Sequence, residues 1–76
     1  MKHLIVFTGK HCKSCHAFIA KLIKHNVPFR EVSTDTPDGA MMASKYHVRS
    51  LPTAMIGGST LMQKDMTIEK IQEKMK

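Results

Sequence analysis

Residues 11–16 read HCKSCH and contain both cysteines of the chain, Cys12 and Cys15. Three kinds of site use this C-x-x-C spacing. In a thiol–disulfide oxidoreductase, the first cysteine lies at the start of a helix and the second lies one turn inside it. In a c-type cytochrome, C-x-x-C-H attaches haem, and residues 12–16 match that pattern. In a soft-metal site, both thiolates bind the ion. The surrounding sequence has to distinguish these three chemistries.

The composition is that of a folded domain without a membrane span. The 76 residues, of which 42% are hydrophobic and 24% are charged, predict one domain over residues 1–76. No apolar stretch approaches the roughly 20 residues that cross a bilayer, so we expect no membrane association. Lys and Arg are scattered singly and aromatic residues are few, which argues against nucleic-acid binding. The net charge of +6 instead favours solubility or acidic partner proteins.

The first residues do not resemble an export signal. The apolar run over residues 4–7 is too short for one, and no cleavage site of small residues follows it. We therefore expect a cytoplasmic protein. In that compartment, a single cysteine pair is typical of redox chemistry or metal binding rather than of a permanent disulfide.

The cysteine motif lies between a predicted strand and a predicted helix. Residues 3–8 are apolar and β-branched and end before Gly9, a pattern that favours a buried parallel strand. A loop over residues 9–11 follows. After Cys15, apolar side chains recur at helical spacing, and Asn26 and Pro28 end the helix. The spacing places Cys15 on the buried face and Cys12 at the helix N-terminus. The apolar stripe consists of Phe18, Ile19, Leu22 and Ile23.

The remaining sequence predicts two more helices and three more strands. A strand over residues 28–33 precedes a helix that starts at Thr36 and Pro37 and runs through residue 46. The other expected elements are a strand over 54–56, a turn at 57–58, a strand over 59–63, and a last helix capped by Asp65 or Thr67. The order β-α-β-α-β-β-α predicts an α/β fold, in which a four-stranded mixed sheet has helices on both faces.

This order, with the C-x-x-C motif after the first strand and Leu51-Pro52-Thr53 before the third, resembles the thioredoxin-like superfamily over the whole chain. In size the chain is similar to glutaredoxins and to the small redoxins that reduce ribonucleotide reductase. Residues 46–53 look like the thioredoxin version of the cis-proline segment, and residues 56–58 look like glutaredoxin. The resemblance implies a thioredoxin fold in which Pro52 is cis and packs beside Cys12.

The chain departs from the family patterns at several positions. His11 stands where many thioredoxins have tryptophan, and Val6 stands where they carry a buried acid. Residues 59–60 are Ser-Thr, whereas glutaredoxins usually place an Asp after the Gly-Gly pair to hold the glutathione amine. Lys10 lies two residues before the first cysteine, whereas the lysine of glutaredoxins usually lies three before it. The expected electron donor is a thioredoxin reductase or glutathione, and the missing Asp favours the reductase.

The motif suits disulfide exchange. Cys12 is the expected nucleophile, because a helix N-terminus and the charges of Lys10 and Lys13 favour its thiolate and lower its pKa below the value of about 8.5 for a free cysteine. Cys12 attacks a substrate disulfide, and Cys15 resolves the mixed disulfide. We therefore predict a dithiol–disulfide oxidoreductase that reduces disulfides in partner proteins, acts as a monomer and needs no cofactor or metal.

The substrate contacts are expected around this pair. A cis bond before Pro52 leaves the backbone of Leu51 free to pair with an extended substrate strand. The other predicted substrate-binding residues are Lys10, His11, Lys13 and Thr53.

Two alternatives remain open on the residues alone. A c-type cytochrome fits residues 12–16 with Met55 or Met62 as axial ligand, but the predicted strands and the absence of an export signal argue against it. A small metal carrier would bind its ion through Cys12 and Cys15. Such carriers usually have a methionine at the position of Lys10, and they have no need of residues 51–53.

Overall fold

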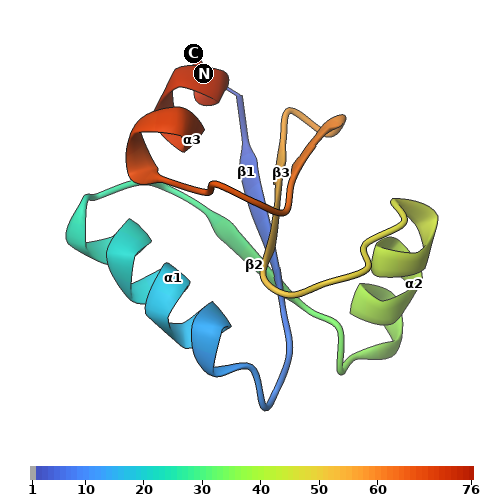
Figure 1. Cartoon of the computed structure of the whole chain (residues 1–76). Coiled ribbons are helices and arrows are strands. Elements are labelled where there is room, and N and C mark those ends of the chain that lie inside the picture. Colours follow the sequence, from blue (N-terminus) through green and yellow to red (C-terminus); the bar gives the residue numbers. More distant parts are fainter. Residues whose placement is uncertain (1) are drawn as a thin grey trace.

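The computed structural model describes residues 2–76 (Figure 1). Its seven elements follow the predicted order. They are β1 Leu4–Thr8, α1 Lys13–Lys24, β2 Arg30–Ser33, α2 Pro37–Lys45, β3 Thr53–Ile56, β4 Thr60–Met62 and α3 Ile68–Met75. The predicted α/β class and element order are confirmed. The second and fourth strands are shorter than predicted, and the third begins one residue earlier.

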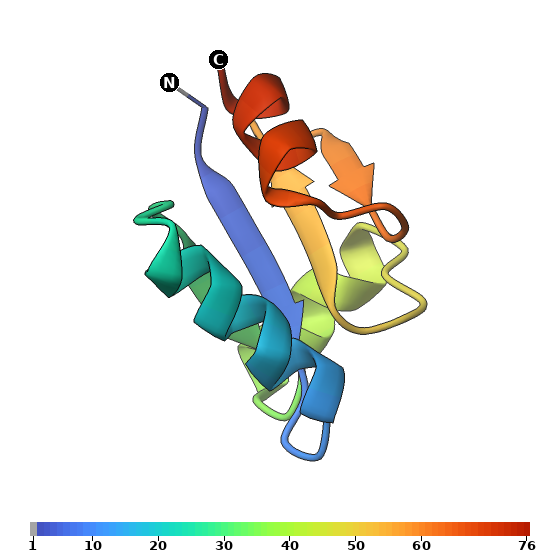
Figure 2. The same ribbon diagram turned by 60° about the vertical axis from the view of Figure 1, so that its left-hand side comes forward.

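The four strands form one mixed sheet in the order β2-β1-β3-β4. β1 runs parallel to β2 and antiparallel to β3, and β3 pairs with β4 as an antiparallel hairpin. Helices α1 and α3 cover one face of the sheet and α2 covers the other (Figures 1 and 2). Because β1 and β2 are parallel, their carboxyl ends meet at the same edge of the sheet, where the chain enters α1 and α2.

Two apolar clusters hold the sheet between the helices. The larger one joins alternate residues of β1 and β3 to α1 and α3, whereas Ile23 of the predicted stripe is 63% exposed. It contains Leu4, Val6, Phe18, Leu22, Val27, Ala54, Ile56, Met62, Ile71 and Met75. The smaller one, under α2, contains Phe7, Ala43 and Met55. The alternation along β1 is the period of two that a strand with two covered faces requires. Both clusters fix β1, so the loop that follows this strand leaves from a rigid base.

Helix α1 begins and ends as its sequence predicts. Cys12 is the N-cap, with extended backbone, and its sulfur accepts the backbone N–H of Cys15 at 3.1 Å. Lys21 and Lys24 lie in the last turn, where cations stabilise the negative end of the helix dipole. After the helix, Asn26 adopts a positive φ of 55°, a conformation that asparagine tolerates better than most residues.

The way in which α2 starts explains why residue 39 is a glycine. The Thr36 side chain caps the helix by accepting the N–H of Gly39, and its hydroxyl donates to the carbonyl of Ser33, both at 2.9 Å. A β-carbon at position 39 would lie 1.7 Å from that same carbonyl oxygen. The glycine that weakens the helical pattern in sequence is therefore needed where α2 starts against the end of β2.

The cap of α3 is Thr67, one of the two candidates. Its side chain accepts the N–H of Lys70 at 3.2 Å. Asp65 is not the cap: it has a positive φ of 53°, and its carbonyl accepts the N–H of Thr67 at 2.9 Å. Asp65 therefore shapes the turn that leads into the helix.

Candidate redox site

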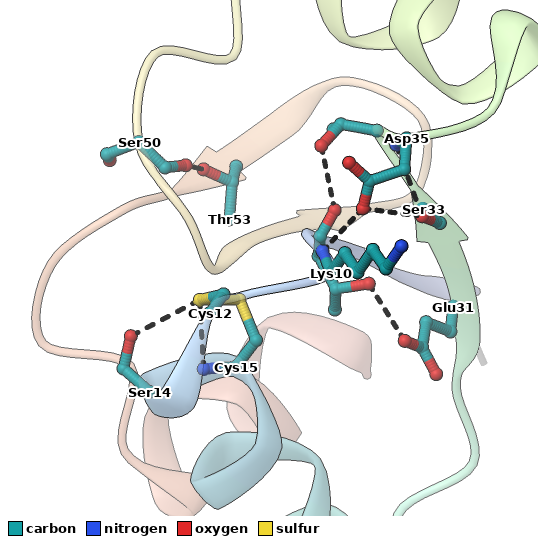
Figure 3. Close-up of a disulfide and its surroundings, with 11 residues drawn as sticks. Lys10, Cys12, Ser14, Cys15, Glu31, Ser33, Asp35, Ser50 and Thr53 are labelled. Atoms are coloured by element: carbon teal, nitrogen blue, oxygen red, sulfur yellow. Dashed lines mark hydrogen bonds between the residues drawn. A yellow bond between two sulfur atoms is a disulfide. The ribbon is translucent and has the colours of Figure 1, made fainter.

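Cys12 and Cys15 form a disulfide at the N-terminus of α1, with their α-carbons 5.2 Å apart (Figure 3). The sulfur of Cys12 accepts the N–H of Cys15 and lies 3.4 Å from the hydroxyl oxygen of Ser14. The hydroxyl is the donor in this contact, since a disulfide sulfur carries no proton. The strand–loop–helix geometry thus places both sulfurs in the first turn, as the spacing predicts.

The two cysteines differ in exposure. Cys15 is 2% exposed and faces the sheet, whereas Cys12 is half-buried at the rim. This asymmetry follows from the helix period, because a residue three positions after the cap turns back toward the core. A molecule that approaches from solvent therefore meets Cys12 first.

The segment before β3 lies next to this helix start. The Leu51–Pro52 bond is cis, as the family resemblance implies. Leu51 comes close to the loop before Cys12: a β-carbon added at Gly9 would lie 2.9 Å from the Leu51 Cδ1 atom and 3.9 Å from the Cys12 β-carbon. Gly9 therefore lets the loop after β1 and the segment before β3 approach each other. The sequence predicts only a loop at Gly9 and gives no sign of this contact.

Thr53 lies at the start of β3 with its side chain turned into the fold. The residue is fully buried, and its hydroxyl donates to the carbonyl of Ser50 at 2.5 Å. The side chain holds the turn that contains Pro52. Only the backbone of Thr53, and not its side chain, is therefore left to contact a substrate.

Lys10, His11 and Lys13 are exposed and flank Cys12 in sequence. The first turn of α1, which contains Lys13, has no acidic residue, whereas the Asp35 carboxylate lies at the backbone N–H of Lys10. The side chains of these three residues are therefore accessible from solvent.

The loop after β2 supports the loop after β1. The Asp35 carboxylate accepts the backbone N–H of Lys10 (Figure 3). The Thr34 N–H and hydroxyl both donate to the carbonyl of Thr8 at 2.9 Å. Asp35 and Thr34 were not singled out in the sequence. Their position could have indicated this role. Both residues follow a strand that is parallel to β1, and the carboxyl ends of neighbouring parallel strands lie at the same edge of a sheet.

Metal ligands are sparse at this site. Within residues 2–76, no group of three or more His, Cys, Asp or Glu side chains lies together as a metal site requires.

The fold and the cysteine pair together define a thioredoxin-like domain with a redox-active C-x-x-C pair. A family model described as glutaredoxin matches residues 4–61, and the chain belongs to the glutaredoxin family. The crystal structure of the thioredoxin-like protein BC3987 is similar, with a TM-score of 0.71 and 26% sequence identity over 93% of this chain and 97% of that one. A search among curated proteins gave no match.

These findings support a redox role for the Cys12–Cys15 pair. They do not fit the c-type cytochrome alternative, because the motif that matched haem attachment lies in a glutaredoxin-type domain. Among the helices of residues 2–76, none has the length and apolar character to cross a bilayer.

Proposed function

We propose that this chain is a dithiol–disulfide oxidoreductase that reduces disulfides in partner proteins. The observation that carries the proposal is the asymmetry of the pair: a half-buried Cys12 caps α1, and Cys15 lies behind it at 2% exposure. We propose further that residues 1–76 act as one monomeric domain in the cytoplasm.

Cys12 is the proposed nucleophile. The N-terminus of α1 offers unpaired N–H groups and a positive dipole, and Lys13 adds positive charge in a first turn that contains no acidic residue. All three favour the thiolate, which is the reactive form.

The reaction balances as a two-electron exchange. The Cys12 thiolate attacks one sulfur of a substrate disulfide, forms a mixed disulfide and releases the first substrate thiolate. The Cys15 thiolate then attacks the Cys12 sulfur, forms the intramolecular disulfide and releases the second. The substrate gains two electrons and the Cys12–Cys15 pair loses them, so a donor must reduce the pair before the next cycle.

The proposed substrate contacts surround Cys12. The cis Leu51–Pro52 bond supports a role for the Leu51 backbone in pairing with an extended substrate segment. Lys10, His11 and Lys13 are exposed beside the same residue and suit acidic side chains of a partner. Pro52 acts in this proposal by setting the direction of the Leu51 backbone.

We expect a thioredoxin reductase to reduce the oxidised protein faster than glutathione does. The turn at Gly57 and Gly58 is followed by Ser59 and Thr60, so no carboxylate is available there to bind the glutathione amine. The test compares NADPH consumption with thioredoxin reductase and with glutathione plus glutathione reductase, using a disulfide peptide as the final acceptor.

The matched variant in this test is Ser59→Asp, which restores a carboxylate after the glycine pair. It should raise the rate with glutathione and leave the rate with the reductase unchanged. Turnover of the natural chain with glutathione at or above its rate with the reductase would contradict the donor assignment. A failure of both donors to support peptide reduction would contradict the proposed function itself.

A further inference from the structure

A cavity of about 610 Å³ lies where β1 and β2 begin. The cysteine pair follows the other end of β1, and a rise of about 3.3 Å per residue over the five residues of this strand separates the two ends. In Figure 2 the start of β1 lies beside the end of α3, away from the start of α1. The volume falls in the range of about 300–1,000 Å³ that is typical of small-molecule sites. The cavity is therefore a candidate binding site separate from the redox site.

The buried part of the cavity lining is apolar. Leu4 and Met75 are 2% and 3% exposed, and Phe29 is half-buried and packs against the larger apolar cluster. None of these three side chains carries a charge or a hydrogen-bond donor. A ligand of this cavity therefore needs an apolar body that displaces water from this surface.

The exposed part of the lining is basic. It includes Lys2, His3 and Arg30, and no Asp or Glu lines the cavity. Glu31, which follows Arg30 in the sequence, lines a different cavity, where its carboxylate accepts the Thr8 hydroxyl at 2.8 Å (Figure 3). Two positive charges without a carboxylate in the lining favour a ligand that carries a negatively charged group.

The backbone beside Lys2 is held on both sides. The N–H of Lys2 donates to the carbonyl of Met75 at 2.7 Å, and the N–H of Gly57 donates to the carbonyl of His3 at 2.9 Å. A β-carbon at Gly57 would lie 3.1 Å from the Lys2 Cδ atom, so the glycine leaves room for the Lys2 stem against the turn between β3 and β4. The charged side chain of Lys2 therefore starts from a fixed position beside the apolar lining.

We propose that this cavity binds an amphipathic carboxylate, such as a medium-chain aliphatic acid. The carboxylate pairs with Lys2 and Arg30, and the guanidinium can donate two parallel hydrogen bonds to it. The aliphatic chain covers the buried apolar lining and removes that surface from water. A highly charged anion such as a nucleotide does not suit this site, because its other polar groups would lie on apolar surface without partners. This inference goes beyond the proposed function and does not depend on it.

A titration of the oxidised natural chain with octanoate, followed by two-dimensional ¹H–¹⁵N NMR, tests the proposal. We expect the amide signals of residues 3–5 and 29–30 to shift with saturation, and those of residues 12–15 to stay unchanged. Acetate has the same charge without the chain and should cause no shift at the same concentrations. From butyrate through hexanoate to octanoate, the affinity should rise by up to about fourfold for each added methylene, because each one buries apolar surface.

Charge variants test the other half of the ligand. Arg30→Gln should weaken octanoate binding about tenfold, because a hydrogen bond between charged groups is lost. It should leave the binding of 1-octanol, which is uncharged, unchanged. The matched control is Lys64→Gln, which removes a positive charge from the segment after β4, outside the cavity lining, and should leave the octanoate affinity unchanged. Both substitutions change exposed side chains, so the fold is kept.

Several results would overturn the proposal. The absence of a saturable shift with octanoate would show that the cavity does not bind this class of ligand. Equal affinities for acetate and octanoate would show ion pairing without a contribution from the apolar lining. An equal loss of affinity in Arg30→Gln and Lys64→Gln would show a general effect of net charge. Saturable shifts at residues 3–5 with a peptide rich in Asp and Glu, but none with octanoate, would assign the surface to a protein partner instead.

Discussion

Cys12→Ser is expected to abolish the reduction of disulfide substrates. The half-buried Cys12 is the sulfur that a substrate meets first, and a serine hydroxyl does not ionise near neutral pH to replace the thiolate. Serine is also a preferred N-cap residue, so it can accept the Cys15 N–H and keep the start of α1 intact. The measurement is cleavage of a disulfide peptide that carries a fluorophore on one half and a quencher on the other.

The matched control for this variant is Ser14→Ala, which changes the neighbouring position and leaves the cysteine pair in place. It removes one hydroxyl contact to the Cys12 sulfur and should retain most of the activity. Cleavage of the peptide by Cys12→Ser at a rate near that of the natural chain would show that Cys12 is not the nucleophile.

Cys15→Ser is expected to accumulate a covalent adduct with the substrate. Attack by Cys12 remains possible, but the buried thiol that would release the substrate is gone. The adduct should be stable without reductant and disappear on addition of excess dithiothreitol. Mass spectrometry of the variant after incubation with a disulfide-containing peptide measures it directly.

The double variant Cys12→Ser, Cys15→Ser sets the background for this experiment and should form no adduct. If the adduct formed instead in Cys12→Ser and was absent in Cys15→Ser, the roles of the two cysteines would be reversed. That result would conflict with the 2% exposure of Cys15.

The sequence predicts the element order and the position of the cysteine pair because both depend on local patterns. The helical stripe after Cys15 and the apolar run before Gly9 are visible without any tertiary contact. The cis bond at Pro52 came from the family resemblance, since no local pattern distinguishes a cis proline from a trans one. The choice between Asp65 and Thr67 as helix cap needed the backbone conformation of both residues.

The contacts that support the site could not be predicted in the same way. The bonds from Thr8 to Glu31 and from Lys10 to Asp35 join residues 23 and 25 positions apart, across the crossover between β1 and β2. These bonds depend on the register of the two strands and on the path of each loop. The spacing of apolar residues in the sequence defines neither of these. The approach of Leu51 to Gly9 depends on a still longer separation in the chain. For Thr53, the sequence could not show that the side chain bonds within its own turn.

A redox titration of the natural chain tests most directly whether Cys12 and Cys15 form a reversible redox pair. The protein is equilibrated in buffers of defined thiol–disulfide potential and quenched with a maleimide, and the number of labelled cysteines is read by mass spectrometry. We predict a single two-electron transition between fully labelled and unlabelled protein, with a midpoint between about −270 and −180 mV, the range of thioredoxins, glutaredoxins and disulfide isomerases. Labelling of both cysteines at every potential, or of one cysteine without the other, would contradict a reversible dithiol–disulfide pair.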